Sequence, residues 1–492
     1  MRRRTGMEAV ELVERDDVAP RPEDPGDVAP RRRSRRWLLV PLLVAVALVG
    51  AQVVVEARER AAVEALAQVE GVVRPVDEDV QILWTLDAGT QWVPWSGQTG
   101  GVLVGLQRAS DGSQALIAVD ELTGERRWTT PLADAHADHA EDGFSPVGGC
   151  AVEPGDSGRI VCLVTDAYLA FRQTENVLVP SDVSRIVVAD SADGSVVAEH
   201  EAPGAVAFTV LPGAVAVGVP RADGALVVTA TDLLTGRQHW QSVVPTAGAE
   251  PDEGGFVDRS TTMLRTDDGL AVVTAGRRIT VLDGDGGPAR TVIDASNGFA
   301  VDERLGVVVA FSLDDEGQET TTIVGGGPDL VLPGRLARVS ADDGSLSDLV
   351  LAAGSRIRAY DRSTGRELWD VGHGLSGTAV VARGRAYLST PDGVVAIDGR
   401  TGAELWRAPV LTGRTMGDLV TDGHHLLSAQ QRPDEPGAVT ALNDWPGVGE
   451  LVAYRFDDGG EDWRVDLPGT LLGVASEGHT LLGWGPAGAV LG

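Results

Sequence analysis

The chain has 492 residues, of which 43% are hydrophobic and only 4% are aromatic. This hydrophobic content excludes a mostly disordered chain, and the length is too great for one ordinary core unless the fold is a barrel or a repeat array. Aspartate and glutamate (72) outnumber lysine and arginine (41), which gives a formal net charge of −31. Because so acidic a surface repels nucleic acid, we expect no nucleic-acid partner.

The N-terminal region predicts a tail followed by a membrane span. Residues 1–36 are charged and Pro-rich, which predicts a disordered tail. Residues 37–55 carry no charge over a length that spans a bilayer, and arginine occupies five of the six positions at 31–36. The positive-inside rule then predicts a single-pass cell-membrane protein with a cytoplasmic N-terminus. A cleaved signal peptide, with small residues at 47–51, is the alternative, and the long leader argues against it.

Residues 56–79 predict a helical stalk or linker. Helix-forming residues with apolar spacing run from Glu56 to a glycine at position 71. Beyond it, abundant glycine with valine, leucine and threonine predicts many short strands and tight turns. Residues 80–492 are therefore expected to form one extracytoplasmic β domain.

One pattern, Ala-x-Asp-x-x-Thr-Gly-x-x-x-Trp, is repeated along this domain. The copies occupy residues 118–128, 230–240, 359–369, 396–406 and, with Arg455 in the aspartate position, 453–463. Two weaker copies, at Asp190 and Asp283, keep the aspartate and lose the tryptophan. The repeated residues are Asp120, Gly124, Trp128, Asp232, Gly236, Trp240, Asp361, Gly365, Trp369, Asp398, Gly402, Trp406, Gly459 and Trp463.

Each repeated residue has a structural reason. An aspartate at a strand end accepts hydrogen bonds from turn amides, and glycine supplies positive φ, so Asp-x-x-Thr-Gly predicts a hairpin turn. The tryptophan is the large apolar group that we expect to wedge against the neighbouring unit. One unit is then a small antiparallel sheet whose faces need neighbours, and a spacing of roughly 40–50 residues suits a four-stranded propeller blade.

The motif resembles the tryptophan-docking motif of the pyrroloquinoline-quinone-repeat superfamily, the quinoprotein alcohol dehydrogenase-like β-propellers. The resemblance covers about residues 80–492. It implies an all-β propeller and does not by itself imply catalysis, because unrelated functions share one fold.

The two ends of the domain predict how the ring closes. The segment around Trp84 resembles a tryptophan strand without its preceding turn, and residues 469–492 resemble the strands that lead into such a turn. We expect a last blade shared between the two ends, which removes free sheet edges. Together with seven internal units, this predicts an eight-bladed propeller of four-stranded antiparallel blades, preceded by one transmembrane helix.

The two cysteines, Cys150 and Cys162, predict a structural disulfide. They are symmetric about Asp156 in a Pro-Gly-Asp-Ser-Gly turn, so a hairpin places them opposite each other. We expect the bond to staple an insertion between two units. Residues 155–158 resemble a serine-protease nucleophile segment, but a nucleophilic serine needs a placed base, and no other motif of that family is present. The turn interpretation is therefore preferred.

Three other polar clusters have the residue types of metal ligands. Residues 134–142 contain two histidines and four carboxylates, His424 and His425 are adjacent, and residues 283–288 faintly resemble a calcium loop. A polar loop or a degenerate blade turn explains each of them as well. We predict no metal site, no cofactor-binding site and no catalytic residue.

The resemblance leaves a quinone-dependent enzyme as the main alternative. Such enzymes hold a Ca²⁺-bound quinone in the central funnel beneath a disulfide between adjacent cysteines, and this chain has no adjacent cysteines. We predict a non-catalytic, membrane-anchored propeller that binds a protein or ligand as a scaffold at the cell envelope. The expected partner is an unidentified envelope or membrane protein. The alternatives are a dehydrogenase that uses pyrroloquinoline quinone (PQQ) with Ca²⁺, and an envelope sensor of sugar or cell-wall ligands.

Overall fold

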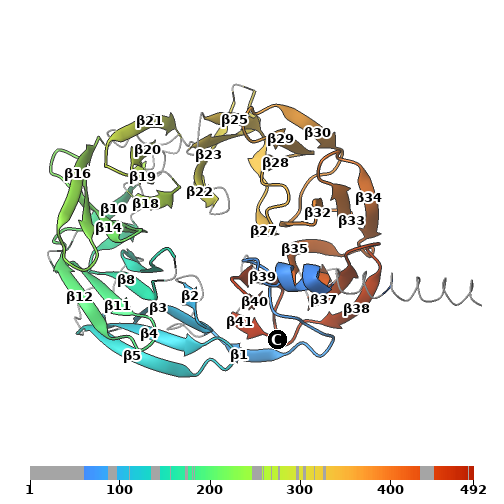
Figure 1. Cartoon of the computed structure of the whole chain (residues 1–492), viewed down its shortest axis with the longest axis horizontal. Helices are drawn as coiled ribbons and strands as arrows, with labels where there is room; N and C mark the ends of the chain where they lie inside the picture. The colour runs from blue at the N-terminus through green and yellow to red at the C-terminus, as the bar shows by residue number, and fades with distance from the viewer. Residues whose placement is uncertain are drawn as a thin grey trace, which may run out of the picture. The chain divides into compact units, whose positions relative to one another are not determined.

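The computed structural model contains antiparallel sheets of short strands joined by tight turns (Figure 1). It describes residues 52, 60–86, 93, 97–109, 111–134, 144–155, 157–171, 175–179, 181, 183–245, 257–258, 260–267, 269–274, 278–294, 298–302, 306–314, 316–324, 329–432, 448–485 and 487–492. The chain divides into two units, Met1–Ala61 and Ala62–Gly492, and the sheets belong to the second.

Nine of the sheets are blades, numbered here in chain order. Blade 1 contains β2 (Gln98–Thr99), β3 (Val102–Arg108), β4 (Gln114–Asp120) and β5 (Arg126–Ala133). Blade 2 contains β7 (Gly149–Val152), β8 (Arg159–Val164), β11 (Arg185–Asp190) and β12 (Val196–Glu201). Blade 3 contains β13 (Ala207–Leu211), β14 (Ala214–Pro220), β15 (Leu226–Asp232) and β16 (Gln238–Val244). Blade 4 contains β18 (Thr261–Thr266), β19 (Gly269–Thr274), β20 (Arg278–Asp283) and β21 (Pro288–Asp294).

The remaining blades follow the same order. Blade 5 contains β22 (Phe299–Asp302), β23 (Val307–Leu313), β24 (Glu319–Val324) and β25 (Leu330–Pro333). Blade 6 contains β26 (Arg335–Leu336), β28 (Leu349–Ala353), β29 (Ile357–Asp361) and β30 (Glu367–Val371). Blade 7 contains β31 (Ala379–Ala382), β32 (Arg385–Thr390), β33 (Gly393–Asp398) and β34 (Glu404–Pro409), with β27 (Val339–Asp342) added in parallel to β31. Blade 8 contains β35 (Thr415–Thr421), β36 (His425–Arg432), β37 (Val448–Arg455) and β38 (Glu461–Asp466). Blade 9 contains β39 (Gly473–Glu477), β40 (Thr480–Trp484), β41 (Ala489–Leu491) and β1 (Ile82–Thr85).

The predicted all-β propeller of four-stranded antiparallel blades is confirmed, and the predicted number of eight blades is wrong. Among the described residues, nine hydrophobic clusters each lie between consecutive blades, the last between blades 9 and 1. The additional blade is blade 5. The repeated motif does not predict blade 5, because residues 299–333 contain neither tryptophan nor the Asp-x-x-Thr-Gly turn.

The ring closes through a blade made from both ends of the domain, as predicted. Strand β1 pairs antiparallel with β41, with Trp84 opposite Val490 (Figure 1). The pairing continues beyond the strands, because the Gln81 amide donates to the Gly492 carbonyl (3.0 Å) and the Gly492 amide donates back to Gln81 (3.2 Å). The first blade-forming strand thus becomes the outer strand of the last blade.

The middle strands of the blades are buried on both faces. Strand β33, with the sequence GVVAID, is buried over its first five residues, because neighbouring blades cover both sides of the sheet. Outer strands alternate instead, as in β16, where exposed and half-buried residues follow one another up to a buried Val244. The middle strands therefore have continuous apolar runs in the sequence, whereas the outer strands alternate between more exposed and less exposed residues.

Connections alternate between the two ends of each antiparallel blade. One end, here called the turn end, carries the turns between the third and fourth strands, such as the β4–β5 turn. The opposite end, the loop end, carries the connections between second and third strands, such as the one between β14 and β15. A small tenth sheet extends from the loop-end connections of blades 1, 2 and 3; it contains β6 (Phe144–Pro146), β9 (Tyr168–Phe171), β10 (Glu175–Val179) and β17 (Val257–Asp258).

Residues 62–80, here called the strap, pack on the propeller at the turn end. Val72 forms a parallel bridge with Thr421, and Val72, Val73 and Val76 are buried in the clusters on either side of blade 8. The sequence predicts a helical stalk or linker at residues 56–79. Within that range, residues 60–66 are helical, and the strap belongs to the same compact unit as the sheets.

Polar contacts attach the strap to three blades. The Val73 amide donates to the Thr421 carbonyl in blade 8 (2.8 Å), and the Arg74 amide donates to the His479 carbonyl in blade 9 (3.1 Å). The Arg74 guanidinium lies 2.7 Å from Glu121 Oε1 in the β4–β5 turn of blade 1, where the glutamate is almost fully buried. The strap therefore bridges the junction at which the ring closes.

The predicted localisation needs correction. No helix among the described residues is long and apolar enough to cross a membrane, so the structure does not support a single-pass membrane protein. The predicted tail (1–36) and span (37–55) lie outside the described residues, except for Gln52.

Candidate functional site

Four of the repeated tryptophans, and Trp84 of the closing strand, each bond to the turn of the next blade. Five indole Nε1 atoms donate to the carbonyl of the residue that follows the aspartate position: Trp84 to Glu121 (3.1 Å), Trp128 to Ser191 (3.2 Å), Trp240 to Gly284 (2.9 Å), Trp369 to Gly399 (2.8 Å) and Trp406 to Phe456 (3.0 Å). The same donor and the same acceptor position recur at these five interfaces, which places these residues in blade-to-blade packing.

The aspartates and glycines build the turns that receive the indoles. In blade 1, Asp120 Oδ1 accepts from the amides of Leu122 (3.0 Å) and Thr123 (2.9 Å). Gly124 has a φ of +66°, and a Cβ there would lie 2.6 Å from the Trp84 ring. Asp232, Asp361 and Asp398 cap their turns through Oδ1 in the same way.

Several interfaces depart from this pattern. Gly236 faces His200, whose Nε2 lies 2.8 Å from the Leu233 carbonyl, so a histidine takes the place of the tryptophan. Gly365 faces Leu330 of blade 5. Trp463 packs at the junction of blades 8 and 9, where blade 9 has no third-to-fourth-strand turn because its last strand is β1.

The predicted disulfide is present. Cys150 and Cys162 are directly paired across β7 and β8, with an S–S distance of 2.10 Å and a sequence separation of 12. The bond joins the first two strands of blade 2. It does not staple an insertion, because the inserted hairpin β9–β10 comes after Cys162.

The predicted absence of a metal site remains a prediction. Residues 135–142 of the polar cluster at 134–142 lie outside the described residues. In the described part of the chain, no group of three or more histidine, cysteine, aspartate or glutamate residues could hold a metal ion. His425 instead lies between two carboxylates, with Nε2 3.1 Å from Asp462 Oδ2 and Nδ1 3.4 Å from Asp422 Oδ2.

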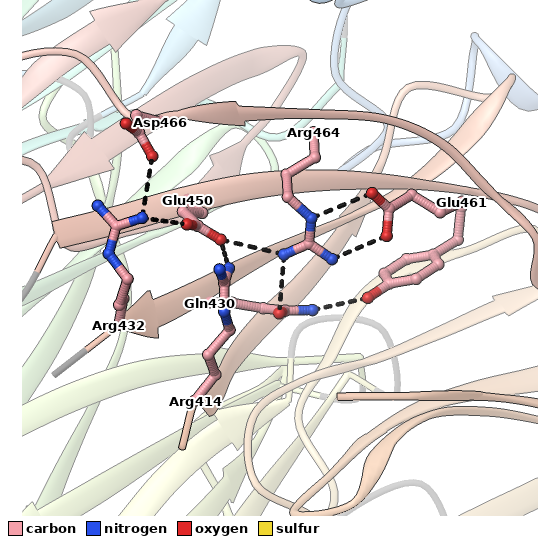
Figure 2. A network of polar contacts seen from close by, with 8 residues as sticks. Arg414, Gln430, Arg432, Glu450, Glu461, Arg464 and Asp466 are labelled. Atoms are coloured by element: carbon pink, nitrogen blue, oxygen red, sulfur yellow. Dashed lines mark hydrogen bonds and ion pairs between the residues drawn. The ribbon is translucent and has the colours of Figure 1, made fainter. Parts of the chain in front are cut away.

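A polar network at the loop end of blade 8 was not predicted from the sequence (Figure 2). Its centre is Glu450, the third residue of β37, whose side chain is 4% exposed. Glu450 Oε1 accepts from Arg432 Nη1 (2.9 Å), and Oε2 accepts from Arg464 Nη1 (3.0 Å) and also contacts Arg414. These three arginines are called the arginine cluster below.

Blade register brings the network together. Glu450 is paired with Gln430 on β36 and with Asp466 on β38, and Arg414 lies just before β35. Arg464 forms a bidentate pair with Glu461, from Nε to Oε1 (3.0 Å) and from Nη2 to Oε2 (2.8 Å). Every strand of blade 8, or the residue next to it, therefore contributes a side chain.

The network places three arginines against three carboxylates, which are Glu450, Glu461 and Asp466. Burial lowers the pKa of Arg414, and the neighbouring Arg464 and Arg432 lower it further. The hydrogen bond from Arg464 lowers the pKa of Glu461. Burial raises the pKa of Tyr454, whose hydroxyl accepts from Gln430 Nε2 (2.6 Å). Such an arrangement holds carboxylates and has no nucleophile paired with a base.

No spacing pattern in the sequence indicates this network. Arg414, Arg432, Glu450 and Arg464 are separated by 18, 18 and 14 positions, and none lies in the repeated motif. Their meeting depends on the register of four strands, which a single sequence does not specify.

The chain belongs to the PQQ-repeat family described as outer membrane protein assembly factor BamB. The model of that family matches residues 116–325 and 353–483, which is more than half of the chain. No curated protein matches the chain.

Solved structures that resemble the chain include BamB from Moraxella catarrhalis, at 15% identity, with 80% of this chain and 95% of that chain covered and a TM-score of 0.37. The C-terminal WD40 domain of Sif2 is 11% identical over 85% of this chain and 99% of that chain, with a TM-score of 0.38. Dihydro-heme d1 dehydrogenase NirN in complex with DHE is 15% identical over 75% of this chain and 74% of that chain, with a TM-score of 0.31. These TM-scores support no inference about the function of the chain.

Proposed function

We propose that the chain is a non-catalytic module that binds another protein. The observation that carries this proposal is its membership of a family described as an assembly factor, since an assembly factor acts by contacting other proteins. Propellers of one fold serve many functions, so the contact surface must be argued from the chain itself.

The loop end is the surface that we assign to this contact. The turn end is occupied by the repeated turns, the docked tryptophans and the strap. The loop end carries the features that differ between blades, namely the small tenth sheet and the network around Glu450. Binding residues lie disproportionately on such variable connections, which a rigid scaffold positions.

A quinone enzyme is the competing function, and the residues do not fit its cofactor. The only two cysteines are bonded to each other across neighbouring strands of blade 2, and they are 12 positions apart. They cannot form the disulfide between adjacent cysteines that the quinone-dependent relatives place over the cofactor. We therefore propose that the chain uses no PQQ and no Ca²⁺.

Site-specific photocrosslinking tests the proposal on the full chain. A photoreactive residue at Leu411, which is 49% exposed at the loop end, is expected to capture a discrete protein partner. The matched position is Leu234, which is 47% exposed in a turn at the opposite end, and we expect no capture there. Equal labelling from both positions contradicts the assigned surface. Dye-linked oxidation of alcohols or sugars after loading with PQQ and Ca²⁺ contradicts the non-catalytic role.

A further inference from the structure

The ring closes between two strands that are far apart in the sequence. Strand β1 pairs antiparallel with β41 over three residue pairs, with Trp84 opposite Val490. No hairpin turn can join residues 82–85 to residues 489–491, so noncovalent contacts hold this junction. What stabilises the closed ring must therefore be sought in the segments that pack around the two strands.

A turn of blade 9 carries the contacts across to blade 1. Thr480, directly after the turn between β39 and β40, is fully buried, and its Oγ1 donates to Glu121 Oε1 of blade 1 (2.5 Å). The amide of the preceding His479 donates to Gln98 Oε1 on β2 of blade 1 (3.2 Å). Blade 9 thus reaches blade 1 through two side-chain oxygens, one on Glu121 and one on Gln98.

The strap binds the same groups. Arg74 Nη1 lies 2.7 Å from Glu121 Oε1, the oxygen that also accepts from Thr480. The Arg74 amide donates to the His479 carbonyl (3.1 Å), and His479 Nδ1 lies 2.8 Å from the Val72 carbonyl. Because Glu121 is only 2% exposed, loss of Arg74 would leave a buried carboxylate without its guanidinium partner. Docking of the strap and closure of the junction therefore stabilise each other.

The other half of the strap is fixed to blades 7 and 8. Val72 forms a parallel bridge with Thr421 of blade 8, and Leu66 is buried in the cluster between blades 7 and 8. Gly71, with a φ of +86°, approaches β27 so closely that a Cβ there would lie 1.8 Å from the Ser340 carbonyl oxygen. The strap therefore extends from blade 7 to blade 1 and crosses the blade that the two ends of the domain share.

We propose that the strap is a latch: while it is docked, β1 stays paired with β41, and when it undocks, the ring opens between these two strands. The contacts at blades 7 and 8 anchor the strap, and the shared contacts at Glu121 and His479 couple it to the junction. Once the strap is undocked, no chain connection crosses this seam, because β1 and β41 come from opposite ends of the domain. Opening there breaks one strand pair and leaves the other strands of each blade paired. The latch concerns the state of the ring and does not depend on the proposed function.

Native-state hydrogen exchange on the full chain, followed by mass spectrometry, tests the latch from the side of the strap. Gly71→Ala introduces a Cβ against the Ser340 carbonyl and changes no residue of β1 or β41. We expect residues 71–76, 82–86 and 489–492 to exchange faster by one common factor of about tenfold, as for a methyl group forced into a packed site. Exchange in β11 of blade 2 is expected to stay unchanged. Gly213→Ala is the matched control, because Gly213 has a φ of +71° and a Cβ there would meet no atom within 4 Å.

Thr480→Val tests the same coupling from the side of the junction. It removes the hydroxyl bond to Glu121 and leaves the sequence of the strap unchanged. We expect residues 71–76 to exchange about tenfold faster, the usual effect of losing a hydrogen bond to a charged group, because coupling between two sites is reciprocal. Thr390→Val is the matched control, since Thr390 is equally buried and its Oγ1 donates within blade 7 to the Gly393 carbonyl (2.7 Å).

Each outcome decides the proposal. Faster exchange confined to the strap in Gly71→Ala, or confined to the junction in Thr480→Val, means that the two dock independently and overturns the latch. An equal rise in β11 assigns the loss to unfolding of the whole ring and also overturns it, as does unchanged exchange in both variants. If Gly71→Ala does not give the circular dichroism spectrum of the folded wild type, Thr480→Val decides alone by the same criteria.

Discussion

Substituting Gly402 by alanine tests whether tryptophan docking stabilises the ring. Gly402 ends the Asp398 turn of blade 7 with a φ of +72°. A Cβ at this position would lie 2.7 Å from both the Cβ and the Cγ of Trp369. The Trp369 side chain, which belongs to a residue only 7% exposed and bonds to the Gly399 carbonyl at 2.8 Å, must therefore move.

The loss of stability that we expect for Gly402→Ala is the sum of a backbone effect and a packing effect. Positive φ costs alanine roughly 1–2 kcal/mol, of which about 0.5 kcal/mol is recovered because the unfolded chain is less flexible. Displacing a packed side chain adds about 1–3 kcal/mol, and losing the indole hydrogen bond adds about 1 kcal/mol. We therefore expect the free energy of unfolding to fall by about 3–5 kcal/mol.

A matched glycine separates the two effects. Gly413 has a φ of +81°, and a Cβ there would meet no atom within 4 Å. Gly413→Ala is expected to lose only the backbone part, about 1 kcal/mol. Urea unfolding followed by circular dichroism compares the two variants. In a Trp369→Ala background, Gly402→Ala is expected to cost less than in the wild-type background but more than Gly413→Ala, because the clash with the indole is gone while the 2.7 Å approach to the Cβ of residue 369 remains. Equal losses for the two single variants in the wild-type background would refute the docking argument.

Three further perturbations test other parts of the ring. Arg74→Met leaves the buried Glu121 without its guanidinium partner, so we expect a loss of about 1–3 kcal/mol in urea unfolding, and Glu121→Gln in the same chain is expected to restore part of it. Reducing the Cys150–Cys162 bond is expected to cost about 2–4 kcal/mol, measured as a lower melting temperature in dithiothreitol. Hydrogen bonds from Ser363 and Thr364 lower the pKa of Asp361 from 3.8 to about 2. Because this pKa is lowered on folding, the ionised Asp361 carboxylate stabilises the fold above about pH 4, and this stabilisation is lost as the pH falls towards 2. If the melting temperature of Asp361→Asn depends on acid pH in the same way as that of the wild type, this expectation is wrong.

Docking explains why most of the propeller could be predicted from the sequence. The interface between blades 1 and 2 requires an indole at Trp128 and a glycine at 194 where no side chain can fit. Such requirements appear in the sequence at fixed spacing. The shared last blade was also predictable, because the strand around Trp84 had no turn before it.

Blade 5 shows where this reasoning stops. Its outer strand meets the next turn through Leu330 and Leu332, which lie near Gly365. Ordinary aliphatic packing replaces the indole, so the motif disappears while the blade remains. The sequence does contain one indication of blade 5. Gly365 lies in a full copy of the motif, but the copy that precedes it, at Asp283, has no tryptophan to dock on that turn.

The strap and the arginine cluster depend on tertiary contacts that no local pattern encodes. The valines at 72, 73 and 76 are apolar in a segment with helix-forming neighbours, which is also typical of a linker. The arginine cluster requires strands β36, β37 and β38 to be in one register. Sequence spacing cannot define that register for residues drawn from four separate segments.

The division of the propeller into two ends links these observations to function. At the turn end, five of the carbonyls that follow the aspartate positions are already bonded to indoles, and Glu121 is bonded to the strap. A partner at that end would have to displace contacts that hold the ring together. At the loop end, the Arg432 side chain is 46% exposed, so a contact there need not break the blade. A binding surface at the loop end therefore conflicts least with the stability of the fold.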